Sequence, residues 1–347
     1  MKKLFTPFLL LLSAFAMQHV KAQEIEDAGV YMKAINKAQA DFNKTYMSYI
    51  SAAWHSTRAA KIDRLRQQVV DNLTTCRYKI IDLPIYKHDN ALRQANIDYL
   101  WLLTKIFNDD YSHLVNMESL IDQSFDQMEL YLLFEEKIND TLKAANDRMA
   151  VAEKNFAAKY NVTLVSDKSD AIEKMDVANK VAKYRDKVYL LFFKCGWQES
   201  QLIGAISKKN LTKIEQARSA LQKYAADGFT ALDSLNGYDN DVSLETACKQ
   251  ALTYFKKEAE TEITKVSDFL LKQENFTKIK TTYDSKPKNT RTKQEEDLYT
   301  QSLNDVNASF AVASAAFKGI FADRDKVIIN WNSADQKFSD KHVPYYR

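Results

Sequence analysis

Few residues in this sequence are spaced for catalysis or metal binding. Beyond the first 22 residues its histidines occur singly, at His55, His88, His113 and His342. Zinc and di-iron sites use ligands at helical spacing, as in His-Glu-x-x-His or Glu-x-x-His, and neither motif occurs. The haem-attachment motif Cys-x-x-Cys-His is missing as well. The sequence therefore predicts no catalytic residue, no metal site and no cofactor, and a protein that is not an enzyme.

Neighbouring acidic residues are the other candidates for chemistry. Two such groups lie in predicted helices, at 135–136 and at 295–297. Acid–base catalysis by two carboxylates requires groups that oppose each other in a pocket, whereas these follow one another along predicted helices. We interpret them as solvated helix faces. His88 lies in a predicted turn and is interpreted as a solvated loop residue rather than a ligand.

The cysteines, Cys76, Cys195 and Cys248, leave two interpretations open. An odd number without close spacing is neither a disulfide framework nor a zinc site. Cys195 and Cys248 can pair across two helices in an oxidising compartment. Alternatively all three are buried, small apolar residues, which is the interpretation we favour.

The N-terminus predicts export. Residues 1–3 are Met-Lys-Lys, residues 4–17 are largely apolar, and Val20 and Ala22 supply small residues before a cleavage point at Gln23. We therefore assign residues 1–22 to a cleaved signal peptide. The alternative, a membrane anchor, needs a longer apolar run. No cysteine follows for lipid attachment, so the expected location is the periplasm, the cell surface or the extracellular space, with no transmembrane segment in the mature chain.

Charge and composition exclude several classes. The chain has 49 basic and 46 acidic residues, and removal of the signal, with Lys2, Lys3 and Lys21, balances them at 46 each. Nucleic-acid binding requires a basic surface, so no nucleic-acid partner is expected. Six glycines and four prolines in 347 residues are too few for turn-rich β folds or phosphate-binding loops. The composition predicts an all-α fold of long helices.

Apolar periodicity predicts two series of helices. The first covers residues 24–54, 60–82, 89–120 and 124–161, and the last of these has an apolar stripe with spacings of three and four: Phe134, Ile138, Leu142, Ala145, Met149, Ala152 and Phe156. Residues 161–169 break the period. The second series covers 170–206, 211–235, a helix capped by Asp241, and a closing helix that includes 299–321. Asn236-Gly237 supplies a turn, and a polar mobile loop is expected over 277–293.

The two series resemble each other. Tyr86, Asp89 and Leu92 match Tyr238, Asp241 and Leu244 at an offset of 152, whereas Asn139-Asp140 and Phe156-Ala157 match Asn304-Asp305 and Phe321-Ala322 at an offset of 165. This predicts two tandem repeats of an antiparallel four-helix bundle, over 23–162 and 163–333, followed by an irregular C-terminal tail over 334–347. The alternative is a single longer bundle.

Two kinds of short segment suggest further roles. The apolar runs at 99–103 and 188–193 are interpreted as helix core, and the alternative is a membrane-active or partner-binding segment. The triplets Asp140-Thr141-Leu142 and Asp233-Ser234-Leu235 resemble the acceptor for O-glycosylation of some exported bacterial proteins, at Thr141 or Ser234.

The export signal, the paired helices and the closing run Phe156-Ala157-Ala158-Lys159-Tyr160-Asn161 resemble a loose group of exported helical surface proteins of Gram-negative bacteria. Members often carry a lipobox cysteine, which this chain lacks. The resemblance implies a non-catalytic role and supplies no catalytic residues. We expect binding, adhesion or scaffolding at the cell envelope with a protein or glycan partner. The alternative is a membrane-active protein of the pore-forming or toxin-like kind.

Overall fold

The structure is a computed structural model that describes residues 25–56, 58–107, 125–164 and 170–346. Throughout these ranges the chain is helical or in short turns, and they contain no strand beyond two isolated β-bridges. The all-α prediction is confirmed. The predicted signal peptide, His113 and the expected end of the third helix lie outside the described residues.

The helices follow the predicted order. They are α1 (Ala28–His55), α2 (Ala59–Ile81), α3 (Ala91–Lys105), α5 (Phe125–Lys159), α6 (Asp170–Ser207), α7 (Leu211–Asp233), α8 (Ser243–Lys257), α9 (Ile263–Asp284) and α10 (Lys293–His342). A π-helical turn, η2 (Glu258–Glu262), joins α8 to α9 without a break. Successive helices pack against each other along the chain, and α10 also returns to pack on α8.

Side-chain caps begin several helices. Asp27 accepts a hydrogen bond from Val30 N at 2.7 Å at the start of α1, and Asn210 caps α7 in the same way. Thr292 and Glu295 form a reciprocal capping box at the start of α10. Such caps satisfy backbone N–H groups that have no partner within the helix, which explains why the helices begin at these residues.

The same turn precedes α3 and α8. An isolated β-bridge joins Tyr86 to Asp89 and Tyr238 to Asp241, and the two residues between each pair have positive φ. Each aspartate then accepts a hydrogen bond from the backbone N–H two residues later, at 3.1 and 2.9 Å. The prediction that these aspartates are the N-caps is wrong by one residue, because Asn90 and Val242 occupy the N-cap positions. Each aspartate still accepts a hydrogen bond from the first N–H of its helix.

Buried apolar residues form two main clusters. One joins α1, α2, α3 and the end of α5, and the other joins α6 to α10. Ile50 and Trp54, near the end of α1, pack against the second cluster rather than the first. The first helix therefore contacts both parts of the molecule.

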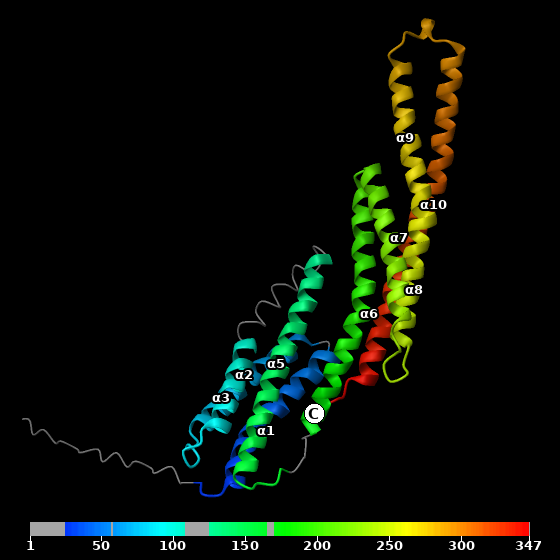
Figure 1. Ribbon diagram of the computed structural model, residues 1–347. Helices are drawn as coiled ribbons and strands as arrows, with labels where there is room; N and C mark the ends of the chain where they lie inside the picture. The colour runs from blue at the N-terminus through cyan, green and yellow to red at the C-terminus, as the bar shows by residue number, and fades with distance from the viewer. Residues whose placement is uncertain (1–24, 57, 108–124, 165–169, 347) are drawn as a thin grey trace, which may run out of the picture.

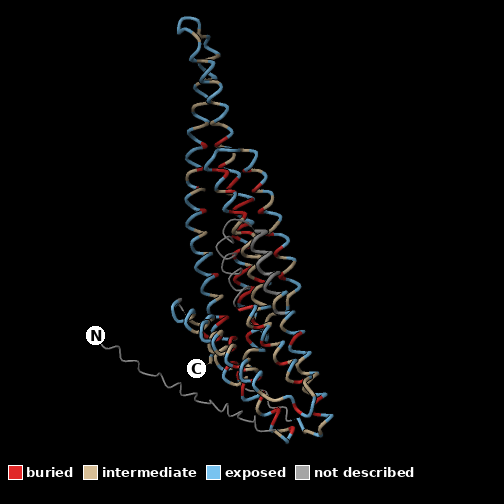
Figure 2. Tube along the Cα trace, turned by 90° about the vertical axis from the view of Figure 1, so that its left-hand side faces the viewer, coloured by how far each residue is buried: buried red, intermediate tan, exposed pale blue. Residues whose placement is uncertain are grey.

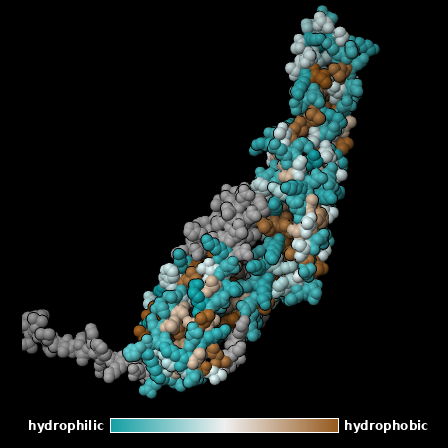
Figure 3. Space-filling model, viewed as in Figure 1, coloured by the Kyte–Doolittle hydropathy of each residue, from teal (hydrophilic) through white to brown (hydrophobic). Residues whose placement is uncertain are grey.

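The molecule is elongated, and the hairpin of α9 and α10 extends beyond the ends of α6 and α7 (Figure 1). No residue from 271 to 308 is buried, and Figure 2 shows this end in the colours of intermediate and exposed residues. Hydrophilic residues cover most of the face seen in Figure 3. At the far end of the hairpin, α9 and α10 contact each other through aromatic rings, with Tyr299 next to both Phe276 and Tyr283.

Two predictions about the C-terminal part are wrong. The expected loop over 277–293 shortens to 285–292, because α9 continues to Asp284. The expected irregular tail over 334–347 is helical as far as His342. Phe338 and Val343 are each 1% exposed, so this segment is held by burial in the second core.

The match between the closing helices also changes. Phe156 lies against Tyr86, with ring centroids 5.3 Å apart, and Phe338 lies against Tyr238 at 6.0 Å. Phe321, which the sequence comparison paired with Phe156, is 38% exposed. Phe338, and not Phe321, thus lies beside Tyr238 as Phe156 lies beside Tyr86, and these two phenylalanines are 182 residues apart, 30 more than the 152 that separate the two tyrosines. The long α9–α10 hairpin accounts for the difference.

In the described ranges, no helix combines the length and the apolar character that crossing a membrane requires.

Candidate functional site

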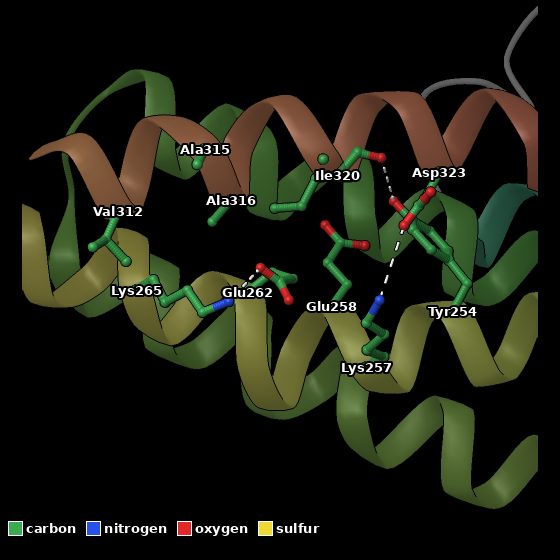
Figure 4. Close-up of a pocket in the computed structure, with 11 residues that line it drawn as sticks. Tyr254, Lys257, Glu258, Glu262, Lys265, Val312, Ala315, Ala316, Ile320 and Asp323 are labelled. Atoms are coloured by element: carbon green, nitrogen blue, oxygen red, sulfur yellow. Dashed lines mark hydrogen bonds and ion pairs between the residues drawn. The ribbon is translucent and has the colours of Figure 1, made fainter.

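An open pocket of about 440 Å³ lies where α8 and η2 pass α10 (Figure 4). A volume of this size falls in the range of small-molecule sites. The α10 wall consists of small and aliphatic residues apart from Asp323 at one end, and the opposite wall is largely charged. Glu258, Glu262 and Lys265 line the pocket from η2 and α9, and Ala316, Gly319 and Ile320 line it from α10.

Local sequence explains why the helices leave this space. Ala315, Ala316 and Gly319 lie on one side of α10, and a Cβ added at Gly319 would have no neighbour within 4 Å. On the opposite side, the π-helical turn widens the helix at Glu258–Glu262. Turns of this kind are rare and are frequent at functional sites.

Glu258 is the unusual residue of the pocket. It is 1% exposed, and among the residues that the structure describes neither carboxylate oxygen has a partner in hydrogen-bond geometry. Figure 4 shows its carboxylate directed from η2 toward α10. Burial, followed by repulsion from Glu199, raises the pKa of Glu258 to about 8. At neutral pH this carboxyl group therefore holds its proton.

Glu199 from α6 is equally buried, at 1% exposure, but has partners. Arg324 Nε on α10 lies 2.9 Å from its Oε2, and Tyr254 donates its hydroxyl hydrogen to Oε1 at 2.8 Å. Burial raises the pKa of Glu199, and Arg324 and Tyr254 oppose that shift. Residues from α6, α8 and α10 thus form one polar cluster inside the core.

The charges at the mouth of the pocket are paired with each other. Lys265 Nζ lies 2.8 Å from Glu262 Oε2, and Lys257 Nζ lies 4.0 Å from Asp323 Oδ2. Both lysines therefore have an acidic partner, and Arg324 has Glu199. Glu258 is the acidic group of this site without a cationic partner among the described residues.

The histidines named from the sequence do not converge. His88 is exposed in the turn before α3, which confirms its interpretation as a solvated loop residue. His55 contacts Asp340 and Val343, whereas His342 contacts Asp241. Across the described ranges, no three His, Cys, Asp or Glu side chains gather in a way that would hold a metal ion.

The cysteines are buried and free, as the favoured interpretation requires. Cys195 and Cys248 belong to the same core cluster. Burial raises the pKa of each thiol to about 12, so neither is a reactive nucleophile at neutral pH. Cys76 lies in the other cluster.

The remaining candidates lie on helices. Glu296 and Asp297 are exposed, as predicted, while Glu295 caps α10. The pair at 135–136 lies in α5, and its side chains are outside the described residues. Thr141 and Ser234 are exposed, and each hydroxyl donates to a carbonyl of its own helix. The apolar runs at 99–103 and 188–193 each contribute buried residues: Leu100, Leu103 and Val188.

The sequence-based search missed Glu199, Glu258, Tyr254 and Arg324. A signal was present, because Glu199 falls between Cys195 and Leu202 in the apolar stripe of α6. A charged residue at such a position must find a partner or hold a proton. The apolar stripe of α6 does not reveal which other helix supplies the partner of Glu199.

Comparisons of the chain with protein-family models, with curated proteins and with solved structures find no match.

Proposed function

We propose that this chain is an exported, non-catalytic helical protein of the bacterial cell envelope that acts by binding, with the pocket beside η2 as its binding site. The observation that carries the proposal is Glu258, a buried carboxyl group without a hydrogen-bond partner among the described residues, at the wall of a cavity of about 440 Å³. An unpaired buried polar group is costly, so its presence at a cavity favours a function.

We further propose that the chain consists of two tandem copies of an antiparallel four-helix unit. The matched turns support this, as do the matched ion pairs from the closing helices. Lys159 Nζ lies 2.8 Å from Asp89 Oδ2, and Lys341 Nζ lies 2.7 Å from Asp241 Oδ2. On this proposal the second copy has acquired the pocket, since its third and fourth helices are the elements that were lengthened.

Native mass spectrometry tests the binding function. The purified protein is incubated with a small-molecule extract of a Gram-negative envelope and desalted. We expect a ligand mass on the wild-type chain and none on Gly319→Leu, whose side chain enters open space at the pocket. Gly204→Leu is the matched control, because a Cβ at Gly204 in α6 also has no neighbour within 4 Å.

Both substitutions remove a helix-interior glycine, so both are expected to preserve folding. Absence of any adduct, or an equal adduct on Gly319→Leu, contradicts the proposed function. The membrane-active alternative is tested separately by leakage of dye from liposomes at neutral and mildly acidic pH. We expect no leakage, since Val188 and Leu100 are part of the packed core.

A further inference from the structure

The charges around the pocket specify the chemistry of its ligand. We propose that the pocket binds one organic ammonium group carried on an apolar body, with the Glu258 carboxylate as the counter-ion; this rests on the proposed binding function. The position of Glu258, the ion pairs of the cations beside it and the apolar part of the α10 wall support this proposal.

The cations near the pocket already form ion pairs, which leaves the Glu258 carboxylate for a ligand. Arg324 is held by Glu199, and Lys265 by Glu262, with N···O distances of 2.9 and 2.8 Å. Each of these cations therefore has another carboxylate as its ion-pair partner, and the attraction of Arg324 for Glu258 is too small to offset burial, which raises the pKa of Glu258. A ligand with one positive charge would give Glu258 the ion-pair partner that the other carboxylates already have. An anionic ligand would instead be repelled by the carboxylates. Charge-assisted hydrogen bonds between an ammonium and a carboxylate are among the stronger polar contacts.

The other wall favours an apolar body. Ala315, Ala316, Gly319 and Ile320 present small or aliphatic surface from α10 to the same cavity. Such surface gains free energy by covering hydrocarbon and offers no side-chain hydrogen bond to a polar ligand. A hydrated metal ion does not suit this wall, and Ca²⁺ takes six to eight oxygen ligands, whereas Glu258 offers two.

Binding requires a local movement and releases a proton. Each Glu258 oxygen has less than 1 Å² of exposed area, so an ammonium reaches the carboxylate only when a side chain at the inner end of the pocket moves. The carboxyl group is protonated at neutral pH because its pKa is raised to about 8. Formation of the ion pair therefore expels that proton to the buffer, while the ammonium keeps its own.

Isothermal titration calorimetry with n-hexylammonium chloride tests the inference, with 1-hexanol and hexanoate as neutral and anionic analogues. We expect n-hexylammonium to bind at least about tenfold more tightly than either analogue. Titration at pH 7 in buffers of different ionisation enthalpy should show release of up to about one proton per chain. The affinity should rise as the pH increases toward about 8 and then level off.

Substitutions test whether Glu258 is the residue that binds the ammonium. Glu258→Gln keeps a neutral side chain of the same shape, and we expect at least about tenfold weaker binding and no proton release. Glu260→Gln, in the same π-helical turn but outside the pocket lining and 3.9 Å from Lys256 Nζ, should bind like the wild type within about twofold. Gly319→Leu should block binding, and it serves as the second test should Glu258→Gln fail to fold.

Three results overturn the inference: no binding of n-hexylammonium, equal affinity for 1-hexanol or hexanoate, or unchanged affinity in Glu258→Gln. These results remain distinct from failure of the binding function itself. If n-hexylammonium does not bind but the envelope ligand is retained by the wild type and lost in Gly319→Leu, the ligand class is wrong and the function stands. If neither binds, both proposals fall.

Discussion

Arg324 Nε on α10 lies 2.9 Å from Oε2 of Glu199 on α6. Glu199 is 1% exposed, and among the described residues Arg324 is its only cationic partner. Replacement of Arg324 by methionine keeps the length of the side chain but leaves Glu199 buried without a counter-charge. We expect Arg324→Met to lower the free energy of unfolding by about 3 kcal/mol in urea denaturation.

The double variant Arg324→Met with Glu199→Gln should recover much of that loss, since the unpaired charge is then gone. Lys326→Met is the control, because its pair with Asp323 is largely solvated and should contribute less than about 1 kcal/mol. Equal effects of Arg324→Met and Lys326→Met would show that the buried pair does not support the fold.

The second prediction concerns pH. Between about pH 4.3, the ordinary pKa of a glutamate, and about pH 8, the folded chain holds a proton on Glu258 that the unfolded chain has released. Stability therefore falls as the pH rises through this window. We expect the wild type to melt at a lower temperature at pH 9 than at pH 6. In Glu258→Gln the melting temperature should not fall between pH 6 and pH 9 on account of this group. If the variant shows the same pH dependence as the wild type, Glu258 is not its source.

The third prediction concerns Asp241. Burial raises the pKa of its carboxyl group, but hydrogen bonds from Lys341, Ser243 and His342 outweigh burial and hold the pKa well below its usual value. The resulting stability is present above about pH 3.9, the ordinary pKa of an aspartate, and is lost as the pH falls toward the folded value.

Asp241→Asn retains an oxygen that accepts from Ser243 N and loses the charge. At pH 7 we expect a loss of about 1–3 kcal/mol in the free energy of unfolding, which shrinks below about pH 4. Asp239→Asn, in the same turn and exposed, is the control and should change stability by less than about 0.5 kcal/mol. If the loss of free energy of unfolding does not change with pH, the effect of Asp241→Asn comes from the altered shape of the side chain and not from its charge.

The fourth prediction concerns the contact between α1 and the end of the chain. The His55 ring stacks on Tyr345 with centroids 3.8 Å apart, and His55 Nε2 donates to the Val343 carbonyl oxygen at 3.1 Å. We expect His55→Ala to lower the free energy of unfolding by about 1–3 kcal/mol. His88→Asn, exposed and in a left-handed conformation that asparagine tolerates, should be near neutral. Equal stability of the two variants would mean that this contact adds nothing.

The sequence failed at the distal hairpin for a definable reason. A helix pattern depends on an apolar stripe that faces a core, and residues 271–308 bury none of their side chains. These helices are supported instead by pairs such as Lys278 with Glu274 and Lys280 with Asp284, which give no apolar periodicity. Residues 277–293 therefore have the composition of a polar loop, and the sequence comparison matches Phe156 to Phe321 instead of Phe338.

The sequence by itself determined the features that depend on near neighbours. Apolar spacing gave the helices of the core, and Asp89 and Asp241 marked the turns, because capping and periodicity act over a few residues. Only the tertiary structure decided that Glu199 pairs with Arg324, while Glu258 has no cationic partner among the described residues. α6, η2 and α10 lie far apart in the chain, so whether a buried charge finds a partner depends on how these helices pack.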